Sequence, residues 1–327
     1  MQEKERTPGV MGRNSEGEWI AMFEGAEVLI KALSFILIIV MGYVLKRKGF
    51  FKPEDFYLIS KIVIRITLPC AIISNFSNFT MEKSLLLLFF LGIGCNLIMV
   101  GIGYLMDLKK GGEQQAFDMI NLSGYNIGNF TLPFIQNFLG PAGFAATSLF
   151  DAGNAVMNTG VTYTLAVMAK GEQEKMSLKK AMKDLLSSIP FDAYMIMLIL
   201  AWFQIPVPGL VVSFAATVGG ANTFLALLMI GIGFEIRMEK AKVRRMLRLM
   251  AVRYGTAFLF ALAGFALLPF SLEVRQAMVF VAFGPISSVA VAFTGRVDGD
   301  VELSSAVNSL SIIISIVMIT AALTILL

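Results

Sequence analysis

Apolar residues fill long stretches of this chain, and short polar connections separate the stretches at fairly even intervals. A membrane-spanning helix needs about 20 mainly apolar residues, with a range of about 17–25. On this template the pattern predicts ten spans, of which the sixth is the shortest and ends at Pro206. The spans cover residues 28–45, 56–78, 84–106, 118–138, 142–168, 190–205, 210–234, 246–268, 275–294 and 302–327.

The segments between the spans define the domain organisation. Residues 1–27 are polar and charged and lack the layout of a secretory signal, so they predict a disordered tail. Residues 28–168 hold five spans, residues 169–189 form a charged linker, and residues 190–327 hold five more. Because five is odd, the second set crosses the membrane in the opposite sense to the first. The sequence therefore predicts an all-α polytopic membrane protein built from two inverted five-helix repeats.

Lysine and arginine residues favour alternate connections. One set of loops holds eighteen of them, whereas the opposite set holds only Lys83 and Arg275. Cytoplasmic loops of membrane proteins carry such an excess of basic residues. We therefore expect a multi-pass protein of the cell (inner) membrane whose 169–189 linker is cytoplasmic and whose two termini lie on the outer side.

The composition excludes several function classes. The chain is 57% hydrophobic and 15% charged and contains no histidine, which excludes Ser-His-Asp catalysis and His-ligated metals. It also lacks the Walker A, H-E-x-x-H and G-x-S-x-G patterns. We expect no enzyme, no catalytic residue, no cofactor and no metal site. The lipid bilayer is an expected partner, and nucleic acid is not.

Helix-breaking residues interrupt the fourth and the ninth span at corresponding places. One proline kink, or Gly124-x-x-x-Gly128 as a packing face, would be structural. Two matching breaks beside asparagines instead favour a substrate or ion site, because broken helices present backbone groups to a cavity at the bilayer midplane. The candidate substrate-binding residues of the breaks are Asn126, Gly128, Asn129, Pro133, Pro285, Ser287 and Ser288.

Basic side chains inside the spans are costly in a bilayer, so each needs a role. Lys61 and Arg65 lie on one face of the second span. Either they line a path for an anion, which makes Arg65 a candidate substrate-binding residue, or their long side chains reach the headgroups. We expect Arg248 and Arg253, near the inner end of the eighth span, to reach the headgroups in the same way.

A polar stripe follows one face of the fifth span. Thr147, Asp151, Asn154 and Asn158 recur at helical spacing, and Asn308 in the last span is their nearest counterpart in the second half. Asp151, Asn154, Asn158 and Asn308 are therefore candidates for binding a coupling ion, H⁺ at the carboxyl group or Na⁺. The alternative for Asp151 is a structural hydrogen bond to another helix.

Several motifs resemble the auxin efflux carrier family, which is found widely in bacteria as organic-acid permeases. They are Asn126-x-Gly128-x-x-x-Leu132-Pro133, Phe150-Asp151-x-Gly153-Asn154, the segments 42–49 and 66–69, and the entry into the last span at 299–311. The resemblance covers residues 28–327. It implies that the fourth and ninth helices cross at their breaks, at Asn126, Gly128, Pro133 and Pro285, and that one bundle moves as an elevator against another. Thr131 departs from the family, which usually has glycine there.

The leading hypothesis is thus a secondary active transporter of small organic anions such as carboxylates. A sodium-coupled symporter of the bile-acid type is the alternative within transport, and a membrane sensor or receptor is the alternative of another class. Coupling to H⁺ or to Na⁺ and assembly as a homodimer are left open.

Overall fold

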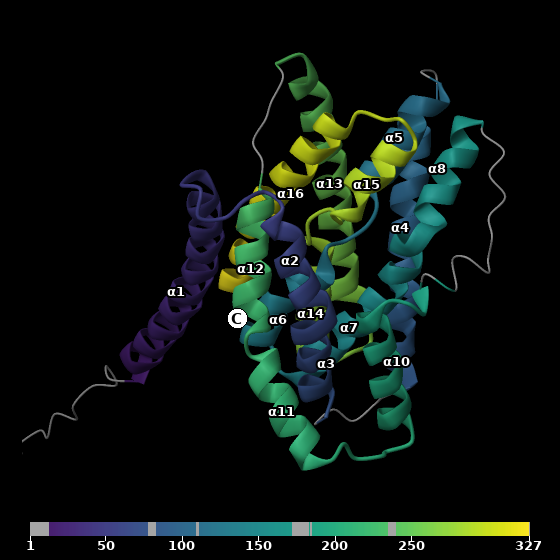
Figure 1. Ribbon diagram of the computed structural model, residues 1–327. Helices are drawn as coiled ribbons and strands as arrows, with labels where there is room; N and C mark the ends of the chain where they lie inside the picture. The colour runs from purple at the N-terminus through teal and green to yellow at the C-terminus, as the bar shows by residue number, and fades with distance from the viewer. Residues whose placement is uncertain are drawn as a thin grey trace, which may run out of the picture.

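The computed structural model describes residues 13–77, 83–108, 111–171, 183, 185–234 and 240–326, with the side chains of 13–29, 83 and 241 left aside. Every regular element within these residues is helical (Figure 1). The elements are α1 (Arg13–Arg47), α2 (Asp55–Ile62), η1 (Val63–Thr67), α3 (Leu68–Phe76), η2 (Lys83–Leu85), α4 (Leu86–Met106), α5 (Gly112–Leu122), η3 (Ile127–Thr131), α6 (Leu132–Phe138), α7 (Pro141–Val156), η4 (Met157–Val161), α8 (Thr162–Lys170), α10 (Ile189–Trp202), α11 (Gly209–Gly219), α12 (Asn222–Gly233), η5 (Lys240–Lys242), α13 (Val243–Leu267), α14 (Leu272–Ala282), α15 (Val289–Arg296) and α16 (Val301–Leu326).

Each predicted span overlaps in sequence with one of these helices or with several successive ones. Five helical segments are long and apolar enough to cross a membrane. They are Asp55–Phe76, Leu86–Met106, Gly209–Gly233, Val243–Leu267 and Val301–Leu326. The fourth and ninth predicted spans are each divided into shorter helices, as their glycine and proline residues require.

The first helix begins earlier than the sequence pattern predicts. α1 starts at Arg13 and so includes residues 13–27 of the predicted tail, while residues 1–12 lie outside the described part; the division into domains stays a prediction. The physical reason is local, because this stretch contains no proline and is rich in glutamate, which favours a helix. Residues 172–182 of the predicted linker also lie outside the described part.

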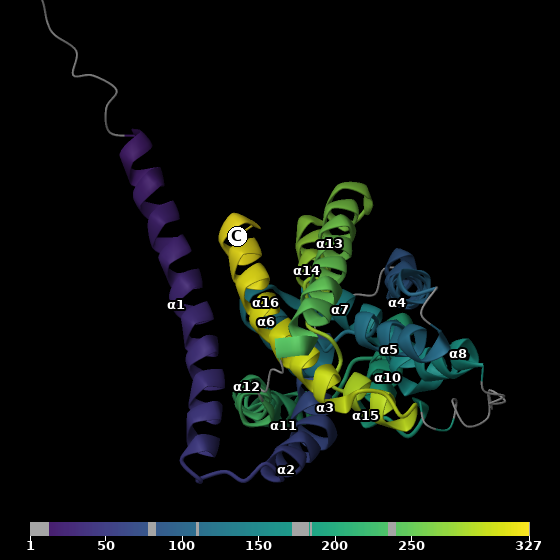
Figure 2. The same cartoon turned by 90° about the horizontal axis from the view of Figure 1, so that it is seen from above.

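The helices pack in two groups. α1, α2, α3, α10, α11 and α12 form the first group, in which α12 lies on α1 and α3 lies between α10 and α11. The second group contains α4, α5, α6, α7, α8, α13, α14, α15 and α16; in it α4 packs on both α5 and α7, and α13 packs on α14. Figure 2 shows α11 and α12 beside α2 and α3, apart from α4, α13 and α14. Contacts of α3 and α10 with α7, and of α12 with η3 and α6, join the groups.

Glycine allows the closest helix contacts within both groups. A Cβ atom on Gly153 of α7 would collide with the carbonyl oxygen of Phe89 in α4, and its counterpart on Gly92 would collide with that of Phe150. A Cβ on Gly231 of α12 would collide in the same way with the carbonyl oxygen of Ile39 in α1. Small residues let helix backbones approach closely in membrane proteins, where lipid gives no hydrophobic drive to associate.

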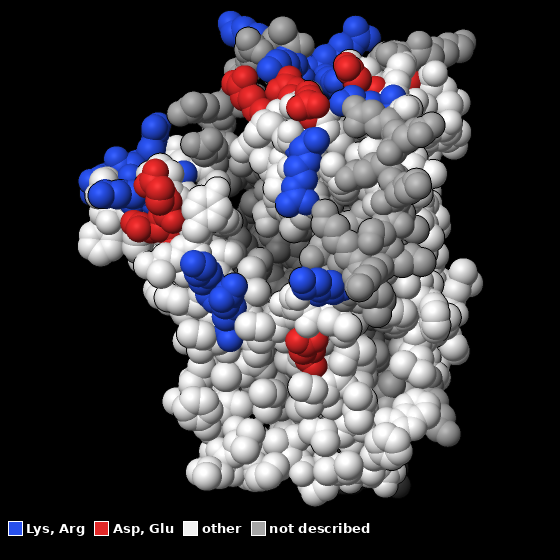
Figure 3. All heavy atoms as spheres, turned by 45° about the vertical axis from the view of Figure 1, so that its right-hand side comes forward, with Lys and Arg blue, Asp and Glu red and all other residues white. Residues whose placement is uncertain are grey.

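The outer surface is apolar along the helices and charged mainly at one end. Large side chains such as Leu210, Leu267 and Ile325 are 85%, 77% and 80% exposed, as expected of side chains that contact lipid. On the face seen in Figure 3, charged side chains gather at the end where α13 begins, and the opposite end is almost free of them. The distribution fits a protein that crosses a bilayer.

Candidate functional site

The first break separates α5 from η3. α5 ends at Leu122, Ser123 is extended, and Gly124 has a φ of +76°, which glycine adopts without strain. Helical geometry resumes at Ile127 as a π-helical turn whose N-cap is Asn126. Pro133 lies in α6, which continues η3 without leaving helical geometry, so the proline removes one backbone N–H donor from this half-helix.

The second break separates α14 from α15. α14 ends at Ala282, and helical geometry resumes at Val289 with Ser288 as the N-cap. Pro285 lies between the two helices and is buried. Neither Asn126 nor Ser288 makes a side-chain capping hydrogen bond, so within the described part of the chain each half-helix begins at a polar side chain that does not cap it.

The two breaks meet. The backbone N–H of Asn126 donates to the carbonyl oxygen of Pro285, with an N–O distance of 2.9 Å. Beside this bond a Cβ on Gly284 would lie 2.9 Å from the hydroxyl oxygen of Thr131, so this threonine fills the space next to the glycine. We call the region formed by residues 123–126 and 283–288 the crossing.

Asparagine side chains hold the first break in place. Asn154 of α7 accepts a hydrogen bond from the Tyr125 N–H at 3.0 Å and donates one to the Tyr125 carbonyl at 2.9 Å. Asn96 of α4 accepts one from the Gly124 N–H at 2.7 Å and donates to the side-chain amide oxygen of Asn154 at 3.2 Å. Sequence reasoning predicted Asn154 but missed Asn96, whose signal was a lone amide within an apolar helix.

A comparable arrangement holds the second break. The amide of Asn308 in α16 donates to the Ile286 carbonyl at 2.9 Å, and the Ile286 N–H donates to the Ser311 hydroxyl at 3.1 Å. In both halves, therefore, an asparagine of the next helix satisfies backbone groups that the break leaves without helical partners. Asn154 and Asn308, expected as ion ligands, are engaged with backbone in the structure.

Arg253 corrects an expectation from the sequence. Its side chain does not reach the headgroups but is completely buried, at 0% exposure. It donates to the carbonyl of Leu122 and, at 3.2 Å, to the carbonyl of Gly284, so it contacts the ends of both α5 and α14. Its guanidinium carbon lies 4.2 Å from the centre of the Tyr125 ring.

Arg248, by contrast, lies near the start of α13 and forms a salt bridge with Asp107, with an N–O distance of 2.9 Å.

Asp151 lies between the two groups of helices. Its carboxylate accepts hydrogen bonds from Asn154 at 3.0 Å and from the Tyr194 hydroxyl of α10 at 3.1 Å. A Cβ on Gly128 would lie 3.6 Å from the same carboxylate. The hydrogen bond to another helix, which was one alternative from the sequence, is therefore present. Asn158 lies next to the first break, because its side-chain amide oxygen would be 2.7 Å from a Cβ on Gly124.

The other predicted site residues are placed less centrally. Asn129 follows the break, and its buried amide oxygen has no partner among the described residues. Ser287 is buried and Ser288 is exposed. Arg65 is exposed on η1, and within the described part no hydrogen bond or ion pair joins it to the crossing.

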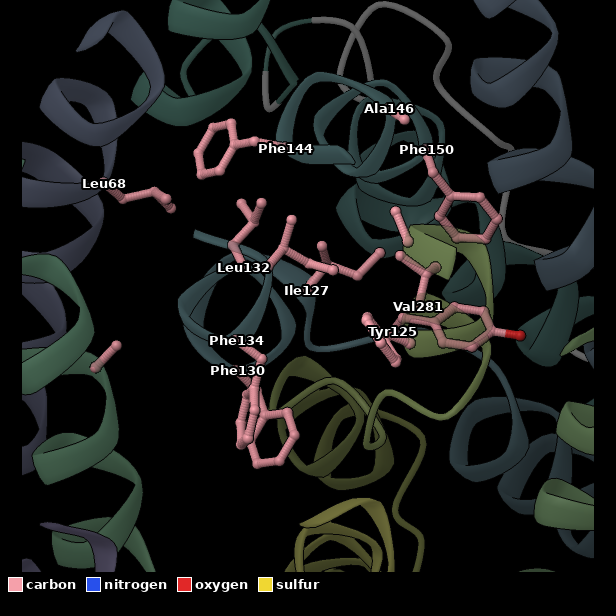
Figure 4. Close-up of a cluster of buried hydrophobic side chains, with 14 of the residues drawn as sticks. Leu68, Tyr125, Ile127, Phe130, Leu132, Phe134, Phe144, Ala146, Phe150 and Val281 are labelled. Carbon is pink, nitrogen blue, oxygen red and sulfur yellow. The ribbon is translucent and has the colours of Figure 1, made fainter. Parts of the chain in front are cut away.

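Apolar side chains frame the crossing. Figure 4 shows Tyr125 beside Val281 and the rings of Phe130 and Phe134 close together, with ring centres 5.3 Å apart. A cavity of about 310 Å³ adjoins Tyr125 between α4, α13 and α14 and is lined almost entirely by apolar side chains such as Leu91, Phe260 and Met278. These apolar neighbours give the buried polar network surroundings of low polarity, which strengthens its hydrogen bonds.

The architecture and the site together define a class. Membrane-spanning helices with two breaks that meet inside the helical bundle are typical of transporters. The chain belongs to the membrane transport protein family (Mem_trans), the auxin efflux carrier family, whose model matches residues 27–323. An uncharacterized transporter of Methanothermobacter thermautotrophicus is 22% identical over 297 residues, which cover 87% of this chain and 94% of that protein. The protein is thus a multi-pass membrane transport protein.

Proposed function

We propose that the protein is a secondary active transporter that moves small organic anions such as carboxylates across the cytoplasmic membrane. The observation that carries the proposal is the contact between the two breaks, at the hydrogen bond from Asn126 to Pro285. Two half-helices begin there, one after Asn126 and one after Ser288. Helix N-termini carry about half a positive charge each and favour anions.

The electrostatics of the crossing support an anionic substrate. The negative ends of α5 and α14 are occupied by Arg253, whereas the positive starts of η3 and α15 have no such partner among the described residues. The region therefore carries a net attraction for anions. The amide of Asn126 and the hydroxyl of Ser288 would donate to a carboxylate, and neutral substrates would gain nothing from this field.

The proposed architecture is a ten-helix inverted repeat that works by elevator-like alternating access. The first two helical segments of each half belong to one packing group and the last three to the other, which supports a division into scaffold and moving bundle. Polar contacts between the groups include Tyr194 with Asp151 at 3.1 Å and Asn137 with Thr223 at 3.0 Å. These contacts would break and re-form during transport.

We place the charged end of the molecule in the cytoplasm and both termini on the outer side, because basic loops stay inside. Proton coupling, if present, would involve Asp151, since its carboxylate lies between the groups and contacts both through its partners. A homodimer remains a prediction from the sequence.

Ligand-dependent thermal stability of the purified protein tests the binding site. A carboxylate that binds the native state raises the melting temperature by mass action. We expect a screen of mono- and dicarboxylates to give a stabilising anion for the wild type and for the control Asn75→Ala. The amide of Asn75 donates within its own helix, at 2.7 Å to the Ala71 carbonyl, and has no other partner among the described residues. Asn126→Ala should lose the shift, and an unchanged shift in Asn126→Ala would contradict the site.

The same screen separates the alternatives. If a carboxylate raised the melting temperature only in the presence of Na⁺, the result would favour the sodium-coupled symporter. Stabilisation by a ligand that is never transported in liposomes would favour the sensor or receptor.

A further inference from the structure

Arg253 is an unusual residue in a membrane protein, because a permanently charged group lies at the middle of a transmembrane helix. It is the eleventh of the 25 residues of α13, and its side chain is fully buried. The guanidinium group remains protonated in proteins, so the charge cannot be removed by burial. A charge at such depth is costly and indicates a specific role.

The counter-charge of Arg253 is not a carboxylate. Within the described residues no acidic side chain forms an ion pair with it, and its hydrogen bonds go to the backbone carbonyls of Leu122 and Gly284. Leu122 is the last residue of α5, and Gly284 lies two residues after the end of α14. The C-terminal end of a helix carries about half a negative charge, so two ends amount to about one. One guanidinium therefore balances both half-helices.

The position matches that of a coupling ion. In transporters with broken helices, unwound carbonyls and the C-terminal ends of half-helices are the groups that coordinate Na⁺. Here the Leu122 carbonyl lies at the end of a half-helix and the Gly284 carbonyl lies in unwound backbone, and both accept hydrogen bonds from the Arg253 guanidinium. The guanidinium group also lies over the ring of Tyr125, which belongs to the first break. Arg253 therefore contacts both segments of the crossing.

We propose that Arg253 is a built-in cation that replaces a bound sodium ion at the crossing and lets this transporter work without Na⁺. It is a positioning residue, because it acts on the two breaks and not on the substrate. The idea rests on the proposed function only in that the crossing is the substrate site. The stability experiment below contains no substrate, so it can fail while carboxylate transport stands, and the reverse also holds.

The experiment compares melting temperatures in NaCl and in choline chloride at equal ionic strength. The wild type should melt at the same temperature in both salts, because no site for Na⁺ is vacant. Arg253→Ala should melt about 10 °C lower in choline, since two carbonyl ends lose their cation. Na⁺ should restore about half of that loss by filling the vacated site, and guanidinium at millimolar concentration should do the same. Arg244→Ala is the matched control, because Arg244 is exposed on the same helix.

A gentler pair of variants separates charge from hydrogen bonding if Arg253→Ala does not fold. Arg253→Lys keeps the cation but loses the planar fork, and Arg253→Gln keeps amide donors but loses the charge. We expect Arg253→Lys to melt closer to the wild type than Arg253→Gln, and only Arg253→Gln to be stabilised by Na⁺. Saturable stabilisation of the wild type by Na⁺, or Arg253→Gln as stable as Arg253→Lys, would overturn the proposal.

Discussion

The asparagines that hold the two breaks allow a quantitative prediction about the difference between the halves. Asn154→Ala removes hydrogen bonds to both the N–H and the carbonyl of Tyr125. A buried polar group left without a partner costs about 1–3 kcal/mol. The variant leaves two such groups, so its free energy of unfolding should fall by about 2–6 kcal/mol. Asn308→Ala removes one bond to the Ile286 carbonyl and should cost only about 1–3 kcal/mol.

The free energy of unfolding can be measured for both variants by SDS titration in mixed micelles. Asn75→Ala serves again as the control. Asn75 lies near the end of α3, and within the described residues its amide donates only to the Ala71 carbonyl of the same helix. We expect the order Asn154→Ala, then Asn308→Ala, then the control, from the largest loss to the smallest. If Asn308→Ala cost as much as Asn154→Ala, the count of backbone partners would not determine the stability of the breaks, and the reasoning would be refuted.

Two further predictions concern packing and pH. Gly153→Ala should destabilise by about 1–3 kcal/mol, because its Cβ collides with the Phe89 carbonyl, whereas Gly94→Ala, with no atom within 4 Å of the new Cβ, should be close to neutral in the same titration. Burial raises the pKa of the Asp300 carboxyl, but its hydrogen bonds with Lys242 and the Leu303 N–H, together with the positive charges of Lys242 and Arg245, outweigh burial and hold the pKa below its usual value. Such a carboxylate stabilises the fold above the unfolded pKa of about 4, and the contribution disappears as the pH falls through the lower folded pKa. Asp300→Asn should therefore lower the melting temperature at pH 7, and the difference from the wild type should vanish in acid; a difference that persists there would contradict this sign.

The helices were predictable from the sequence because each of their determinants is local. Apolar stretches of sufficient length mark the spans, and Gly124 and Pro285 mark the breaks within a few residues. The early start of α1 was missed because its first turns are polar, and a polar sequence does not distinguish an exposed helix from a disordered tail.

The partners within the site were harder to predict, since they depend on contacts between distant segments. Arg253 bonds to carbonyls that are 131 and 31 positions away, and backbone acceptors leave no mark in a sequence. Its nearness to a basic loop suggested headgroup contact instead. Asn96 is similar, because its partner Gly124 is 28 positions away. For Asn96 a useful signal was a single amide near the middle of an otherwise apolar helix, whereas three further arginines precede Arg253 in α13, so nothing of this kind distinguishes it.

Uptake of a radiolabelled carboxylate into proteoliposomes tests the central claim most directly, with the stabilising anion from the thermal screen as substrate. The account predicts saturable uptake by the wild type in sodium-free buffer, and its loss in Asn126→Ala although this variant folds and melts cooperatively. Absence of flux in the wild type, or normal flux in Asn126→Ala, would contradict the claim that the crossing carries organic anions.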